Sequence, residues 1–79
     1  MQHGGKDYSC RVGSDIIRDG MYVEVLATPD TADAILEIFF SDVTFTMTVT
    51  LFAANVPLEV VEWAISVARD RLPVKPGGG

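Results

Sequence analysis

The chain has 79 residues, a formal net charge of −5, one cysteine and one histidine, and 48% of its residues are hydrophobic. This length allows one domain, and the hydrophobic share indicates a globular chain rather than a disordered one. The single cysteine excludes an intramolecular disulfide, and the single histidine excludes the usual zinc clusters. We therefore expect association with another chain to supply the stability that so small a core lacks.

The charges are segregated along the sequence. Eight acidic residues and no Lys or Arg lie between residues 19 and 62, whereas all six basic residues lie outside that stretch. Because an acidic centre repels phosphates, we expect no direct binding to nucleic acid. Either the basic ends fold back on the acidic centre, or the centre attracts a basic protein partner. The candidate acidic face consists of Glu24, Glu37 and Asp42.

The glycine-containing start of the chain predicts a flexible arm over residues 1–14, since it shows no hydrophobic periodicity. Residues 15–73 then form a single domain, and residues 74–79 form a flexible tail. Cys10 has no CxxC partner, which favours a passive thiol over a nucleophile. His3 stands before two glycines, which favours an unstructured position over a ligand.

Asp19-Gly20, placed between apolar runs, predicts a β-hairpin because glycine tolerates the positive φ of tight turns. Its second strand covers residues 21–27, and its first is a short strand over Ile16 to Arg18, with a simple loop entry as the alternative. A loop around Pro29 follows, since proline cannot donate to a ladder. The next strand covers residues 34–40.

A second hairpin joins residues 34–40 to the alternating stretch 43–52. A two-residue turn at Ser41-Asp42 pairs Ile38 with Phe45, and the large apolar residues of the later strand then share one face. The same sheet sets Glu24 opposite Glu37, a like-charge pair that is unfavourable. We therefore expect either a register shifted by two residues or carboxylates splayed into solvent.

Residues 58–72 have the pattern of an amphipathic helix, with Pro57 in its first turn and Arg69 and Arg71 in its last. The stripe expected to lie on the sheet consists of Leu58, Val61, Ala64, Ile65, Ala68 and Leu72. Because the apolar arc is wider than one small sheet needs, a further apolar surface is left over. The candidate interface comprises Val60, Trp63 and Val67 on the helix and Tyr22 and Phe39 on the outer sheet face. The alternative is that the N-terminal arm covers Trp63.

The segments R-D-G-M-Y-V-E-V, E-I-F-F-S-D and V-P-L-E-V-V-E-W-A-I, followed by R-L-P, resemble small bacterial proteins of the domain-of-unknown-function type. Those proteins share a sheet-then-helix layout and have no assigned activity. The resemblance spans roughly Arg18 to Pro73 and carries over no functional residues.

These observations predict an α+β fold: an antiparallel meander of three to four strands with one C-terminal helix packed on one face. The sequence has no nucleotide, hydrolase or metal motif, so we expect no enzymatic activity and no cofactor. It has no leader and no apolar run of the roughly 18–20 residues that span a bilayer, so we expect a cytoplasmic location.

The function expected is that of a homodimeric protein-interaction module. Two alternatives remain open: an acidic, immunity-type inhibitor that masks a basic partner, and a carrier of a small apolar ligand.

Overall fold

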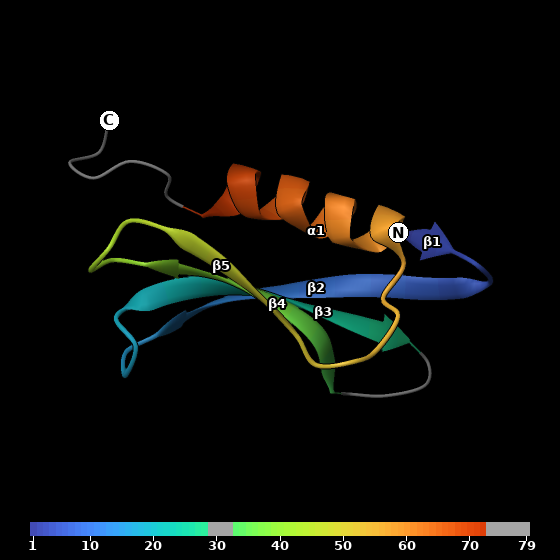
Figure 1. The fold of residues 1–79 in the computed structure, drawn as a ribbon, viewed down its shortest axis with the longest axis horizontal. Helices are drawn as coiled ribbons and strands as arrows, with labels where there is room; N and C mark the ends of the chain where they lie inside the picture. Colours follow the sequence, from blue (N-terminus) through green and yellow to red (C-terminus); the bar gives the residue numbers. More distant parts are fainter. Residues whose placement is uncertain (29–32, 73–79) are drawn as a thin grey trace.

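The computed structural model describes residues 1–28 and 33–72 and consists of one twisted antiparallel sheet with one helix across one face (Figure 1). The strands lie in sequence order, β1-β2-β3-β4-β5. The elements are β1 (Gln2–His3), β2 (Lys6–Asp15), β3 (Gly20–Thr28), β4 (Ala34–Ser41), β5 (Met47–Leu51) and α1 (Leu58–Arg71). The predicted α+β layout is confirmed, with five strands in place of three to four. The centre of the predicted Pro29 loop and the predicted tail, residues 74–79, lie outside the described residues.

The N-terminal segment is not the flexible arm that the sequence predicted. Residues 2–3 and 6–15 form β1 and β2, and β2 is the longest strand of the sheet. Gly4 and Gly5, with φ of 58° and 80°, form the turn between the two strands. Tyr8 lies opposite Ala27 in the ladder with β3, and it belongs to the hydrophobic core. The period of two is present in β2, where Tyr8, Cys10 and Val12 alternate with polar residues and glycine, but it spans only these three residues and was overlooked among the glycines and charges around it.

The hairpin between β2 and β3 is confirmed in place, but its loop is longer than predicted. The residues predicted as a short strand, Ile16 to Arg18, belong with Asp19 to the turn. Asp19 takes the positive φ of 53°. The Asp15 carboxylate accepts hydrogen bonds from the Arg18 backbone N–H at 3.1 Å and from Arg18 Nε at 2.6 Å, which closes the loop.

The hairpin between β4 and β5 is also confirmed, with a different register. Ile38 lies opposite Val49 rather than Phe45, a shift of four residues along the chain. Because the shift is even, the side chains keep the faces that were predicted for them. The cause is a wider loop: Ser41 Oγ accepts hydrogen bonds from the N–H groups of Val43 and Thr44, and Phe45 adopts a φ of 58°.

Helix α1 begins at Leu58, as predicted, and ends at Arg71, one residue before the predicted end, and it is rotated about its axis from the predicted orientation. Its buried residues are Val60, Ala64 and Ala68, which recur every four positions and so form one line along the helix. Leu58, predicted to face the sheet, is exposed. The alanines allow the helix to lie close against core residues from β2, β3 and β4.

Among the described residues, no helix combines the length and the apolarity that crossing a bilayer requires.

Candidate functional site

The sheet face turned away from α1 carries two rows of side chains that cross several strands. One row contains Arg11, Glu24, Glu37 and Thr50, and the other contains Gly13, Tyr22, Phe39 and Thr48. In each row every residue lies opposite the next in the strand ladders. Glu24 therefore lies opposite Glu37, with neither the register shift of two residues nor the solvent-splayed carboxylates that were expected. Instead, an arginine neutralises each carboxylate: Arg11 Nη2 lies 3.0 Å from Glu24 Oε1, and Arg18 binds Glu37.

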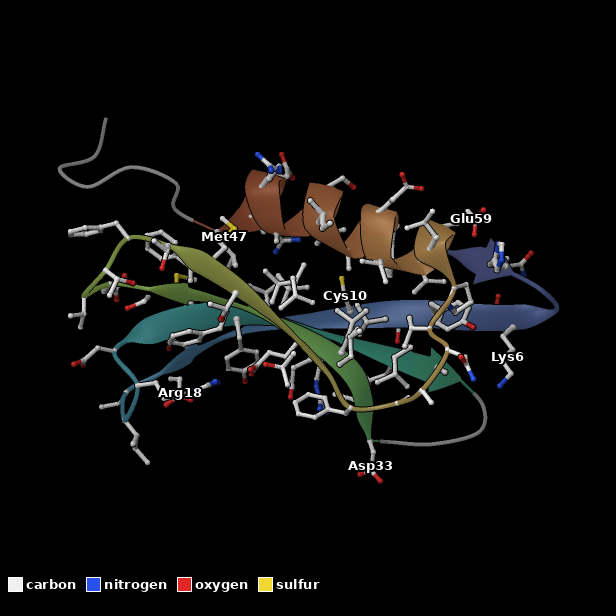
Figure 2. The ribbon with its side chains drawn as sticks, in the orientation of Figure 1. Lys6, Cys10, Arg18, Asp33, Met47 and Glu59 are labelled. Carbon is white, nitrogen blue, oxygen red and sulfur yellow. The ribbon has the colours of Figure 1, made fainter. Side chains whose placement is uncertain are left out.

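Arg18 reaches from the β2–β3 loop over the outer face (Figure 2). Its two Nη atoms donate to the two carboxylate oxygens of Glu37 at 3.0 and 2.8 Å, a bidentate geometry that makes a strong ion pair. The guanidinium carbon also lies 4.2 Å from the centre of the Phe39 ring. The hydrogen bonds to Glu37 and then to Asp15 raise the pKa of Arg18, and the Arg18 hydrogen bond lowers the pKa of Asp15.

These ion pairs neutralise most of the predicted acidic face. Glu37 is buried, with 7% of its surface exposed, and Arg18 compensates its charge. Glu24 is half-buried and compensated by Arg11. Asp42 is exposed in the loop after β4. Two of the three predicted carboxylates thus stabilise the sheet rather than present negative charge to a partner.

The aromatic side chains of the outer face also have neighbours within the chain. A Cβ atom added at Gly13 would meet the Tyr22 ring, and one added at Gly20 would meet the Phe39 ring, so each ring lies over a glycine. Phe39 is in turn covered by Arg18. Tyr22 and Phe39, two predicted interface residues, are therefore half-buried within their own sheet.

The other three predicted interface residues take part in the core. Val60 has no exposed surface, and its prediction as part of an outer helix surface is wrong. Trp63 and Val67 are partly buried and pack against the core. The reason is the rotation of α1, which turns the Val60–Ala64–Ala68 line to the sheet and moves Leu58 outward.

The helix covers β2, β3 and β4 but has at most a marginal contact with β5. As a result, the helix-side face of β5 is open to solvent. Val49 is 49% exposed and Leu51 is 56% exposed. A groove of about 190 Å³ lies beside it, between β5 and the C-terminal half of α1. Met47 lies on the helix side of the sheet at this end (Figure 2). We call this region the β5–α1 surface; it consists of Ile38, Met47, Val49, Leu51, Ile65, Ala68 and Arg69.

No protein-family model matches the chain, and neither a curated protein nor a solved structure matches it. Within residues 1–28 and 33–72, no group of three or more His, Cys, Asp or Glu side chains is placed to hold a metal ion.

The β5–α1 surface was missed because the helix was expected to pack on one face of the sheet, with no distinction between strands that it covers and a strand that it leaves open. The composition of β5 does, however, indicate an exposed edge. The strand M-T-V-T-L has no charge and comes last in the meander, where the sheet must end in an edge. Natural edge strands usually carry charges or proline, so a neutral apolar edge indicates a surface for association.

Proposed function

We propose that this chain is a non-enzymatic protein-interaction module that forms a homodimer through the β5–α1 surface. The observation that carries the proposal is the position of α1, which covers three strands and leaves the apolar face of β5 open. Contiguous exposed apolar surface on a small domain commonly marks an association site. Since a chain of 79 residues has a small core, covering Val49 and Leu51 adds stability that the monomer lacks.

The charge distribution favours this face for a contact between two copies of the chain. Two chains of net charge −5 repel each other, so they associate best where their surfaces are neutral. Strand β5 contains no charged residue, and the charged side chain that lines the groove is Arg69. The acidic residues Glu24 and Glu37 lie on the opposite face, where arginines compensate them.

The outer sheet face is less suited to association. Its aromatic rings lie over glycines, and its carboxylates are paired, so that little apolar area or uncompensated charge remains there. The groove of about 190 Å³ is smaller than the roughly 300–1,000 Å³ of typical ligand sites, which weakens the ligand-carrier alternative. The pairing of Glu24 and Glu37 weakens the alternative of an acidic inhibitor.

Light scattering coupled to size-exclusion chromatography tests the proposal. The 8.6 kDa chain should elute at micromolar concentration with twice its own mass. Val49→Asp should give a folded monomer, because the carboxylate would have to leave water for an apolar contact in the dimer but faces water in the monomer.

Ile17→Asp is the matched control, since Ile17 is 94% exposed in the β2–β3 turn and should tolerate the charge with the dimer intact. A wild-type chain that is monomeric throughout, or a Val49→Asp variant that remains dimeric, would refute the proposal.

A further inference from the structure

We infer that the two copies join edge to edge, with β5 pairing antiparallel to the β5 of a second chain about a two-fold axis at Val49. This inference rests on the proposed homodimer and adds to it the register of the contact. The pairing would unite two five-stranded sheets into one continuous sheet. Both α1 helices would then lie on the same side, because facing residues of paired strands point to the same face.

The main-chain hydrogen bonds of β5 determine which residues can take part. The Ser41 N–H donates to the Thr46 carbonyl oxygen at 3.0 Å, and the Phe52 N–H donates to the Ile35 carbonyl oxygen at 2.8 Å. The main-chain groups of residues 46 and 52 therefore point toward β4. In an antiparallel ladder the direction alternates along the strand. Hence the N–H and C=O groups of Met47, Val49 and Leu51 point away from β4, toward the free edge.

These three residues are self-complementary. With a two-fold axis at Val49, the Val49 residues of both chains face each other, and Met47 faces the partner's Leu51. Each facing pair of this type exchanges two hydrogen bonds, which gives about six across the contact. The side chains of the same three residues point to the helix side of the sheet, so an apolar row of Met, Val and Leu continues from one chain into the next.

The composition of the two sheet edges also favours β5. At the opposite edge, β2 carries four charged residues in the sequence K-D-Y-S-C-R-V-G-S-D, and the short β1 covers its beginning. Charges of this kind protect an edge from pairing. Strand β5, M-T-V-T-L, has neither charge nor proline and is rich in β-branched residues that favour strand pairing.

Disulfide formation at single sites tests the register. Cys10 is first replaced by Ala in all variants, since it is the one native thiol. Val49→Cys should then form a disulfide-linked dimer under mild oxidation, because facing residues of this pair type have Cα atoms roughly 5.5 Å apart, within the range of a disulfide.

Thr48→Cys is the matched control, because Thr48 would face the partner's Thr50 and not the partner's Thr48. The two Thr48 Cα atoms would be separated by more than the roughly 7 Å that a disulfide can bridge. Thr48→Cys alone should therefore remain unlinked, whereas a mixture of Thr48→Cys and Thr50→Cys chains should form the mixed disulfide.

Amide hydrogen exchange gives an independent reading that needs no cysteine. The N–H groups of Met47, Val49 and Leu51 should be protected in the dimer and should lose that protection in the Val49→Asp monomer, while the N–H groups bonded to β4 keep theirs.

The outcomes separate this inference from the proposed function. A chain that is dimeric by light scattering but does not crosslink at Val49→Cys overturns the edge pairing and leaves the homodimer standing. A chain that is monomeric by light scattering overturns both. Crosslinking of Thr48→Cys alone, as efficient as that of Val49→Cys, also overturns the register.

Discussion

The guanidinium of Arg18 contacts two carboxylates and one aromatic ring, and these contacts explain how Glu37 can be buried beside another glutamate. A carboxylate taken out of water needs a compensating charge and hydrogen bonds, and the bidentate contact from Arg18 supplies both. Asp15 holds the same side chain from the other end at 2.6 Å. Loop conformation and sheet stability are therefore linked through one residue.

Arg18→Met should lower the free energy of unfolding by about 2 kcal/mol, since it leaves the buried Glu37 carboxylate without its partner. Urea denaturation followed by circular dichroism measures this loss. Arg11→Met is the matched control: the Arg11 side chain is more exposed and binds Glu24 through a single hydrogen bond, so the loss should be about 0–1 kcal/mol.

The double variant Arg18→Met/Glu37→Gln provides the second test. Removing the buried charge together with its partner should recover part of the stability that Arg18→Met loses. Equal losses for Arg18→Met and Arg11→Met, with no recovery in the double variant, would contradict the role given to Arg18.

At the scale of elements, α1 shows how burial and exposure differ within a single helical turn. Val60 is fully buried against the sheet, whereas Leu58, two residues earlier, is 67% exposed. The sequence analysis assigned them the other way round, with Leu58 toward the sheet and Val60 outward, because both residues are apolar and the pattern fits either rotation of the helix.

Val60→Ala should lower the free energy of unfolding by about 2 kcal/mol, from lost burial and the cavity left behind. In a domain of this size that corresponds to a fall in Tm of about 10 °C. Leu58→Ala should change stability by less than about 0.5 kcal/mol, as exposed positions usually do. Differential scanning calorimetry measures both, and a larger effect at Leu58 than at Val60 would show that the helix is rotated differently.

The sequence predicted the elements whose signals are local. The helix was bounded to within one residue, since Pro57 and Pro73 flank it, and turn residues located both hairpins, although with shorter loops than the structure has. The face of each residue in β3 and β5 followed from a period of two. Two predictions failed because their signals are short or specific to one side chain. The period of two in β2 spans only Tyr8, Cys10 and Val12, and the β4–β5 register was shifted by the hydrogen bonds that the Val43 and Thr44 N–H groups donate to Ser41 Oγ.

The candidate sites were predicted less well than the fold. The proximity of Glu24 and Glu37 was foreseen, but Arg11 and Arg18 were assigned to other segments, so their compensating role was not. The open face of β5 depends on where the helix crosses the sheet. No periodicity in the sequence encodes that crossing, because an amphipathic helix satisfies its own pattern over any of the strands.

At the scale of the whole molecule, net charge and surface chemistry make opposite contributions to self-association. Each chain carries −5, while β5 is neutral. Salt should therefore screen the repulsion between two copies without weakening the apolar contact.

Raising the salt concentration from 0.05 to 0.5 M should leave the dimer Kd unchanged or lower it. Sedimentation equilibrium over a dilution series measures this dependence. A Kd that rises about tenfold or more over that range would indicate that opposite charges hold the dimer together, contrary to the apolar contact proposed.

The strand order also has a consequence for the way the chain folds during synthesis. Because every strand pairs with its neighbour in sequence, the sheet can assemble hairpin by hairpin as the chain leaves the ribosome, without waiting for distant segments. Strand β5 is the last strand to be added, and α1 emerges only after it. A nascent chain that has completed β5 therefore exposes its whole apolar sheet face until the helix is released and docks. During that interval the exposed apolar face can associate with a neighbouring nascent chain, as the transiently exposed hydrophobic surface of folding intermediates does.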